Sequence, residues 1–293
     1  GDWSSDVCSS DLVALLDQEA AYDSVPIHLV MSRLRLKLPP HGQGVADTIE
    51  SLFFGNSSRI LVNNSRSSPV IRRRGLAQGA PLAPILYNVF LDPLLSALEA
   101  SEPPDPMNIT RNFSIPPALS FADDITLLAA SEELLRIRVA IVSNWCHTNF
   151  TRLNPAKTTF IAPAHAGPLL MPSPGEPELE ILPSPKATYL GIPFTNQGAC
   201  VPSLVSSLAS RGNASFFSVA RDTSFSADWN PRWRRTFTKV FVLSRIEYGA
   251  SFIYAAKDPS LSLETLASPL SALVQNCCRW ILSLYSKSKR TPA

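Results

Sequence analysis

Two adjacent carboxylates, Asp123 and Asp124, stand between two short apolar runs within residues 118–129. The apolar residues on both sides predict two short strands with a bend between them. Neighbouring side chains of a straight strand point to opposite faces, so both carboxylates can serve one site only if the chain turns there. Two carboxylates that close repel each other unless a cation lies between them or a pKa is raised. The pair predicts a site for a hard metal such as Mg2+, and the alternative is a plain hairpin turn.

A third carboxylate, Asp17, closes the short apolar run of residues 13–16. Such a run predicts a buried strand that carries the carboxylate at its C-terminal end. Asp23 is the rival for this role, but it follows the predicted strand and is assigned to the start of a helix. That helix is predicted to be capped by Ser24 and to run to about Leu38, where two prolines end it.

The chain has 293 residues, 45% hydrophobic and 17% charged, with a net charge of +2. This composition is typical of a folded globular protein with one large or two smaller domains. The net charge neither demands nor excludes a nucleic-acid partner, so local clusters matter more. Three basic clusters in this charge-poor chain together favour a groove that faces phosphates, although each one singly is typical of a solvated surface. They are Arg33, Arg35 and Lys37; Arg72, Arg73 and Arg74; and Arg232, Arg234 and Arg235.

The five cysteines show no C-x-x-C spacing, and the four histidines are scattered. This pattern favours a reduced chain without a disulfide framework or a zinc site. No apolar run is long enough to cross a bilayer, and no signal peptide opens the sequence. The sequence therefore predicts an intracellular protein.

The first twelve residues have no hydrophobic period and no core pattern. Residues 2–12 resemble the translation of a common short-read sequencing adapter, so they are left out of the fold prediction. The alternative is a polar N-terminal tail. We expect the gene to continue upstream of Val13 and the chain to be a fragment.

Hydrophobic periods and turn residues predict the remaining elements. Helices are predicted at residues 45–54, 85–100, 132–149, 201–208, 231–256 and 270–286. Strands are predicted at 60–63 and 70–73, joined by a polar loop at 64–68, and at 187–194, and residues 154–161 are predicted to turn into a strand. Gly191 is predicted to kink the last strand. The proline-rich residues 163–185 predict an irregular connection, and a domain boundary is expected near Thr195.

Five motifs follow one another in a fixed order. They are residues 16–23, residues 75–84, residues 121–124, residues 154–157 and residues 189–191. In this order and spacing they resemble the motifs of reverse transcriptases from non-LTR (LINE-type) retrotransposons and, more distantly, those of group II intron enzymes. The resemblance runs from about Val13 to Phe194, and a weaker one includes residues 244–249, which are similar to a stretch of the thumb.

The resemblance implies an α+β fold: a right-hand polymerase palm over residues 13–195, with an antiparallel catalytic sheet flanked by helices. It implies a partial fingers insert over residues 39–74 and a helical thumb-like region over residues 196–293. The implied activity is RNA-templated DNA synthesis on a primer, with two Mg2+ ions for which Mn2+ is a substitute. The implied partners are an RNA template, a DNA primer and dNTPs, in a nuclear and cytoplasmic ribonucleoprotein. No membrane partner is expected.

The resemblance also implies a metal-binding set. Asp17, Asp123 and Asp124 would hold the metal ions, with Asp17 and Asp123 as the principal ligands and the carbonyl of Gln18 contributing. Lys157 would protonate the leaving pyrophosphate or bind its charge, and the alternative is an ordinary surface lysine.

Substrate contacts are implied in the same way. Tyr22 would exclude a 2′-hydroxyl, which disfavours an RNA-templated RNA polymerase; the alternative is a core aromatic residue. Gln78 and Gly79 would contact the incoming nucleotide, and Tyr189 and Gly191 would support the primer end.

The chain departs from the family pattern at several positions. Ala77, Ala80 and Ala83 replace proline or small hydroxylated residues, and Phe121 replaces a commoner tyrosine. These changes affect fine positioning and leave the carboxylates in place. The fingers elements that precede the first metal motif are missing, so we expect this fragment to be weakly active or inactive. The alternative function is a non-catalytic retroelement remnant, or a nucleic-acid-binding palm without turnover.

Overall fold

The computed structural model describes residues 12–53, 57–71, 74–101, 116–163, 166–173, 176–196, 198–221, 230–255 and 263–282. The chain divides into two units, Gly1–Pro185 and Lys186–Ala293, and each is described by itself. The division falls before the boundary expected near Thr195, because the strands around Thr195 pack on the helices that follow them. None of the helices in the described ranges is both long and apolar enough to cross a membrane.

A five-stranded sheet forms the centre of the first unit, in the order β11-β8-β1-β7-β6. Its strands are β1 (Leu12–Leu16), β6 (Ala118–Phe121), β7 (Asp124–Ala129), β8 (Thr159–Ile161) and β11 (Pro183–Ser184). β1 lies antiparallel between β7 and β8, and β11 runs parallel to β8. The strand before Asp17 and the carboxylate hairpin are therefore neighbours. β1 already begins at Leu12, which was left out of the prediction but is buried and pairs with Ala129.

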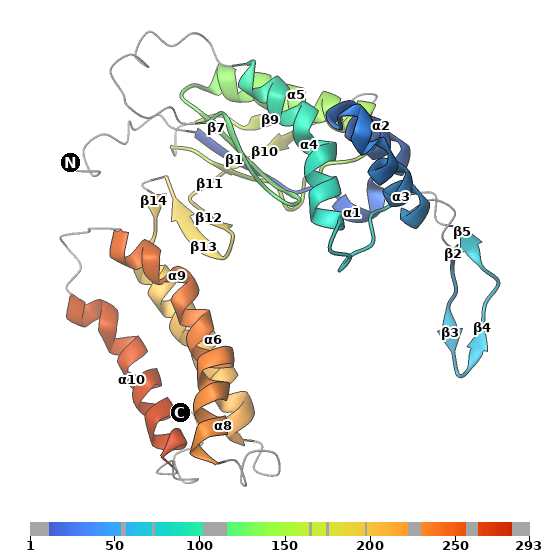
Figure 1. The fold of residues 1–293 in the computed structure, drawn as a ribbon. Helices are drawn as coiled ribbons and strands as arrows, with labels where there is room; N and C mark the ends of the chain where they lie inside the picture. The colour runs from blue at the N-terminus through green and yellow to red at the C-terminus, as the bar shows by residue number, and fades with distance from the viewer. Residues whose placement is uncertain are drawn as a thin grey trace. The chain divides into compact units, whose positions relative to one another are not determined.

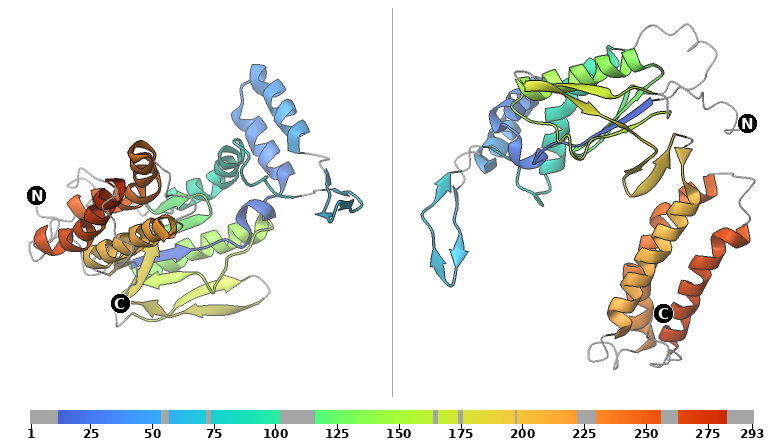
Figure 2. Two further views of the ribbon diagram at one scale, coloured as in Figure 1. Left: turned by 90° about the horizontal axis from the view of Figure 1, so that it is seen from below. Right: turned by 180° about the vertical axis from the view of Figure 1, so that it is seen from behind.

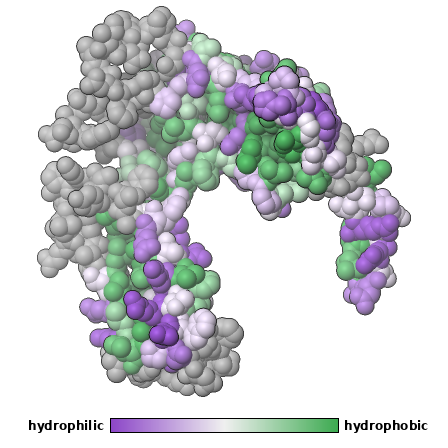
Figure 3. Space-filling view, viewed as in Figure 1, coloured by the Kyte–Doolittle hydropathy of each residue, from purple (hydrophilic) through white to green (hydrophobic). Residues whose placement is uncertain are grey.

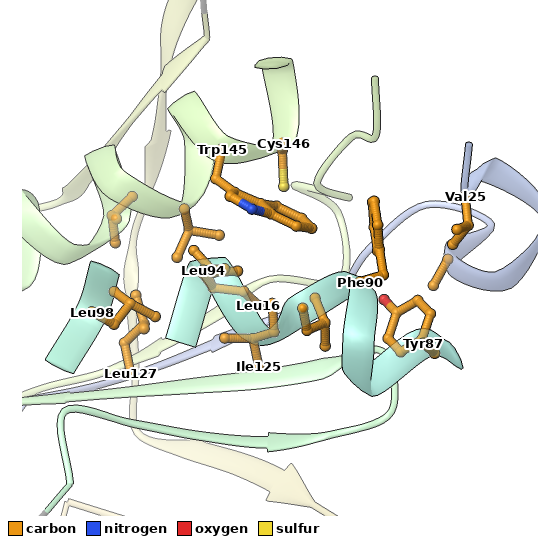
Figure 4. Close-up of a cluster of buried hydrophobic side chains, with 14 of the residues drawn as sticks. Leu16, Val25, Tyr87, Phe90, Leu94, Leu98, Ile125, Leu127, Trp145 and Cys146 are labelled. Carbon is orange, nitrogen blue, oxygen red and sulfur yellow. The ribbon is translucent and has the colours of Figure 1, made fainter. Parts of the chain in front are cut away.

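Two helices, α4 (Ala83–Glu99) and α5 (Glu132–Thr148), cover one face of this sheet (Figure 1). Tyr87, Phe90 and Leu94 of α4 recur at helical spacing and are buried. Together with side chains of the sheet and of α5 they form the main core (Figure 4). The opposite face of the sheet is thus not covered by these two helices.

Helices α1 (Ala21–Ser24), α2 (Ile27–Lys37) and α3 (Gln43–Phe53) follow β1, with a 3-10 turn η1 (Pro40–Gly42) before α3. The prediction that Ser24 caps α2 is wrong. Ser24 ends α1, where its hydroxyl donates to the carbonyl of Ala21 at 3.1 Å, and Pro26 is the N-cap of α2 without a side-chain cap. Pro26 cannot donate a backbone hydrogen bond, so the chain breaks there and restarts as a new helix.

A narrow β-ribbon follows α3, with β2 (Ser57–Ser58) paired to β5 (Val70–Ile71) and β3 (Leu61–Val62) paired to β4 (Ser65–Arg66). The prediction that residues 64–68 form only a polar loop is wrong, because β4 lies within them. The turn is at Asn63 and Asn64, whose φ angles are 46° and 64°, a conformation that asparagine tolerates well. The apolar side chains of the ribbon lie exposed among hydrophilic ones (Figure 3).

The predicted irregular connection over residues 163–185 is also wrong in part. It contains the antiparallel hairpin of β9 (Leu169–Ser173) and β10 (Glu176–Ile181), and β9 packs on α5. Ser143 of α5 donates a hydrogen bond to the carbonyl of Pro172. A two-stranded ribbon tolerates proline at its edges, so proline content alone was a poor guide here.

The second unit combines a small antiparallel sheet with helices (Figures 1 and 2). Its elements are β12 (Lys186–Tyr189), β13 (Ile192–Thr195), β14 (Gly198–Ala199), α6 (Val201–Arg221), α8 (Pro231–Phe237), the π-helical segment η3 (Thr238–Leu243), α9 (Ser244–Ala255) and α10 (Leu263–Ile281). The prediction of one strand kinked at Gly191 is wrong. Leu190 and Gly191 both have positive φ, so they form the turn of a hairpin instead.

Candidate nucleotidyl-transfer site

Asp17 and Asp124 face each other across two neighbouring strands. Leu16 of β1 pairs with Ile125 of β7, and the next position in this register places Asp17 opposite Asp124. Directly opposed residues of an antiparallel pair point to the same face. Since Leu16 and Ile125 are buried in the core, both carboxylates lie on the face that α4 and α5 do not cover.

Asp123 joins them through a tight turn. Phe121 pairs with Asp124, so Ala122 and Asp123 form a two-residue turn between β6 and β7. Ala122 has a φ of 54°, at a turn position where glycine is preferred, and the strain there is about 1–2 kcal/mol. The bend expected between the two strands is present, and Asp124 is the first residue of β7 rather than part of the turn.

The three carboxylates interact electrostatically. Burial raises the pKa of Asp124, and the negative charges of Asp123 and then Asp17 raise it further, while Lys157 lowers it. The site thus holds more negative charge than its own residues neutralise, and a cation there would be stabilised.

Asp17 is the carboxylate with the most evident need for a partner. Its Oδ2 atom is buried and accepts no hydrogen bond from the described residues. The ammonium of Lys157 lies 3.3 Å away, a charge–charge contact without hydrogen-bond alignment, and the Lys157 side chain is 67% exposed. A solvent-facing lysine therefore occupies the position beside Asp17 that a cation would take.

The loop that carries Lys157 is fixed to the strand end that carries Asp17. The backbone N–H of Asn154 donates to the carbonyl of Asp17 at 2.8 Å, and that of Glu19 donates to the carbonyl of Arg152 at 2.9 Å. The N–H of Lys157 donates back to the carbonyl of Asn154 at 3.2 Å, which closes the loop as a turn.

Gln18, unlike Asp17, has a side chain that is hydrogen-bonded within the core. Its side chain is buried, and its Oε1 accepts a hydrogen bond from the hydroxyl of Tyr87 at 2.7 Å. The bridge between Gln18 and Leu153 uses the N–H of Glu19 and of Asn154 as donors, so the backbone carbonyl of Gln18 is not an acceptor in it. That carbonyl, rather than the amide side chain, is the group that suits a metal ligand.

Tyr22 lies between the core and the carboxylates. Its ring stacks on that of Tyr87 with a centroid distance of 4.7 Å. Burial raises its pKa, and the charge of Asp123 raises it further. Tyr22 thus packs against the core, as one alternative has it, and also lies within electrostatic range of Asp123. Its exclusion of a 2′-hydroxyl stays a prediction. Asp23, the rival of Asp17, is exposed in α1.

The loop with Gln78 and Gly79 is tied to Tyr22. The N–H of Leu76 donates to the carbonyl of Tyr22 at 2.8 Å. The N–H of Ala80 donates to the carbonyl of Ala77 at 3.1 Å, and Gly79 has a φ of 84°, which is typical of a type II turn. Gln78 and Gly79 are exposed at the tip of this turn.

A pocket of about 250 Å³ lies beside the same loop. Its lining is Leu52, Phe53, Gly75, Ala77, Ala80, Pro81 and Leu82. The pocket is mostly apolar and backs the loop with carbon atoms, which is suited to supporting the loop rather than to binding a charged group.

Tyr189 and Gly191 lie in the second unit, on either side of Leu190 in the β12–β13 hairpin. Tyr189 is half-buried and pairs with Ile192. The first unit thus gathers Asp17, Asp123, Asp124 and Lys157, while the two residues predicted to support the primer belong to a separate body.

Tyr87 is the residue that the sequence reasoning missed. It is fully buried, stacks on Tyr22 and positions Gln18. The sequence does place this tyrosine on an apolar helical stripe, which indicates burial. A buried tyrosine hydroxyl usually has a hydrogen-bond partner, so a polar contact could have been expected. The partner itself could not be read from the spacing.

The residues suit a divalent metal in type and charge. Carboxylate oxygens are the ligands that hard cations prefer. The buried Asp17 oxygen accepts no hydrogen bond and has only the Lys157 ammonium beside it, so it marks a place for one. Within the described ranges, however, no group of three or more His, Cys, Asp or Glu side chains converges closely enough to hold an ion. The ammonium of Lys157 lies beside this oxygen, so an ion bound there would have to displace it.

Comparisons with known proteins agree on one family. The model of the family described as reverse transcriptase (RNA-dependent DNA polymerase) matches residues 5–194. A retrovirus-related Pol polyprotein from type-1 retrotransposable element R2 of Popillia japonica is 31% identical over 161 residues, covering 55% of this chain and 22% of the relative. A probable RNA-directed DNA polymerase from transposon BS of Drosophila melanogaster is 30% identical, covering 60% of this chain and 19% of the relative. The chain thus spans about a fifth of the length of these relatives.

Among solved structures, telomerase from Candida albicans in complex with a fragment of telomeric RNA superposes over 94% of this chain and 40% of the other. The TM-score is 0.49 at 10% sequence identity, a likeness too loose to support an argument.

Proposed function

Because the chain belongs to the reverse transcriptase (RNA-dependent DNA polymerase) family, we propose that it carries out RNA-templated DNA synthesis. In this reaction the 3′-hydroxyl of a primer attacks the α-phosphorus of a dNTP, a new phosphodiester bond forms, and pyrophosphate leaves. The observation that carries the proposal is the register of β1 and β7, which places Asp17 opposite Asp124 and beside the Asp123 turn.

Asp17 and Asp123 would be the principal ligands of two Mg2+ ions, with Mn2+ as a substitute. Asp124 would add negative charge, and the backbone carbonyl of Gln18 would contribute a neutral oxygen. Bound ions of this kind stabilise charge on the attacking and leaving oxygens of an in-line displacement. Tyr87 would hold Gln18 in place through the hydrogen bond to its side chain.

Lys157 would act at the leaving group. Its ammonium neutralises Asp17 in the structure. When Asp17 serves as a metal ligand, the ammonium of Lys157 would leave this carboxylate and would bind or protonate pyrophosphate.

The remaining contacts follow from position. Tyr22 would bar a 2′-hydroxyl, with its ring held by the stack on Tyr87. Gln78 and Gly79 would contact the dNTP from the exposed turn tied to Tyr22. In the second unit, Tyr189 and Gly191 would support the primer end. The partners would be an RNA template and a DNA primer, in a nuclear and cytoplasmic ribonucleoprotein.

The second candidate function is nucleic-acid binding without turnover. It predicts affinity for a primer–template duplex without extension.

The deciding experiment is extension of a DNA primer on an RNA template with Mg2+ or Mn2+. We expect weak extension by the wild type and none above background in Asp123→Ala, because several kcal/mol of charge stabilisation depend on the carboxylate cluster. Asp23→Ala is the matched control, since Asp23 is exposed in α1, and it should retain activity. Extension that survives in Asp123→Ala would refute the metal assignment, and duplex binding without any extension would favour the second candidate.

A further inference from the structure

The turn between β12 and β13 has residues that are unusual for its backbone conformation. Tyr189 pairs with Ile192, so Leu190 and Gly191 form a two-residue turn, with φ angles of 48° and 79°. Positive φ at both positions defines a type I′ turn, for which Asn-Gly is the preferred sequence. Leu190 is a branched residue at positive φ and is strained there.

Two side chains from helices hold this strained turn. The hydroxyl of Tyr248, on α9, donates to the carbonyl of Leu190 at 2.7 Å. Nη2 of Arg211, on α6, donates to the carbonyl of Gly191 at 3.1 Å. Arg211 is itself fixed by Ser207, whose hydroxyl accepts a second hydrogen bond from Nη2 at 2.9 Å.

The packing of α6 on α9 brings the two side chains to the turn. Gly249 follows Tyr248, and a Cβ atom at Gly249 would lie 2.8 Å from Leu208 and 3.2 Å from Leu204 of α6. A side chain at this position would make the ends of these two leucines shift, so glycine allows the close approach of α9 to α6. A Cβ atom on Gly191 would meet Arg211 at 3.5 Å and Tyr248 at 3.8 Å, so both helices touch the turn itself.

A structural role alone explains this arrangement poorly. An Asn-Gly turn would adopt the same shape without strain and without help from two helices. Strained residues that are held in place by their surroundings are typical of functional sites. The turn is flanked by a guanidinium group and by a tyrosine that is 55% exposed, and cations and aromatic rings are the groups that bind a nucleic-acid strand.

We propose that Arg211 and Tyr248 are positioning residues that hold the Leu190–Gly191 turn in the conformation that receives the primer strand. The inference rests on the proposed polymerase function, and it adds that the helices of the second unit set the shape of the primer contact. Arg211 and Tyr248 then act through the turn, and their loss affects primer binding before it affects chemistry.

The test compares Tyr248→Phe and Arg211→Lys with the wild-type protein. Each variant should weaken the affinity for a fluorescein-labelled DNA primer on an RNA template about fivefold, because each removes one hydrogen bond from the turn. In extension assays the KM for primer should rise by the same factor while kcat at saturating primer stays within about twofold, and Tm should change little. Arg245→Lys, an exposed arginine of α9, is the control and should behave as the wild type.

The outcomes separate the two hypotheses. Duplex binding needs no catalysis, so a wild type that binds primer–template without extending it would count against the polymerase function alone. Unchanged primer affinity in both variants would overturn the positioning assignment. A fall in Tm and kcat together, with KM unchanged, would also overturn it, because that pattern marks a merely structural role.

Discussion

The β6–β7 hairpin and the β12–β13 hairpin have the same turn length and the same kind of strain, but they are held in different ways. Ala122 and Leu190 both adopt a positive φ at the first turn position. The first hairpin is held from the sheet, since β7 pairs with β1 and β6 along its length. The second belongs to a small sheet and is held by Arg211 and Tyr248.

The difference concerns charge as well as support. Asp124, next to the first turn, lies among the like charges of Asp123 and Asp17, with Lys157 as the opposite charge. The turn at Leu190 has both carbonyls satisfied by hydrogen-bond donors. The β6–β7 hairpin thus lies where a bound cation would change the local charge. The β12–β13 hairpin is instead held in one conformation by its hydrogen bonds. Three measurements test this contrast.

The largest effect is expected at Lys157. Replacing Lys157 with alanine removes the cation beside Asp17, so Mn2+ should bind more tightly, by up to about tenfold once solvent screening is allowed for. Mn2+ titration followed by electron paramagnetic resonance measures this affinity. Lys37→Ala is the control, because Lys37 pairs with Asp92 at the surface. Equal or weaker Mn2+ binding in Lys157→Ala would show that the ammonium does not compete with the ion.

A smaller effect is expected from relief of backbone strain. Ala122→Gly should raise the free energy of unfolding by about 1 kcal/mol, because glycine adopts a positive φ without steric cost. Leu190→Gly should gain less, since it also removes a half-buried side chain. Urea denaturation of both variants compares them. A destabilised Ala122→Gly would mean that the catalytic turn is not strained.

The smallest effect is a pH dependence at Asp124. A raised pKa means that the folded protein binds this proton more tightly than the unfolded chain does. The resulting stabilisation is present at acid pH and is lost as the pH rises from about 4 through the pKa of the folded state. Asp124→Asn should therefore flatten the fall of Tm with rising pH in metal-free buffer. An unchanged slope would show that the carboxylates do not interact as described.

The sequence was a good guide to the carboxylates and a poorer guide to the second hairpin. Asp17 and the Asp123-Asp124 pair adjoin apolar runs, and burial of those runs in one sheet is enough to bring the carboxylates together. Leu190, in contrast, is not a turn residue by preference, so residues 187–194 were predicted as a strand. Its conformation depends on side chains that lie 20 and 58 residues away in the chain, which local patterns do not report. The contact between Gln18 and Tyr87 was out of reach for the same reason.

The loop between α5 and β8 has a consequence for how fast Lys157 can change partners. The N–H of Asn154 donates to the carbonyl of Asp17, and the carbonyl of Asn154 accepts from Lys157 and from Thr158. The turn is thus closed on a residue that is tied to the end of β1. The backbone here has little freedom to swing as a hinge. The ammonium travels by rotation of its own exposed side chain, which takes picoseconds to nanoseconds rather than the microseconds or longer of a collective loop closure. Exchange between the carboxylate and the leaving group would then be much faster than nucleotide turnover, and it would not limit the rate of synthesis.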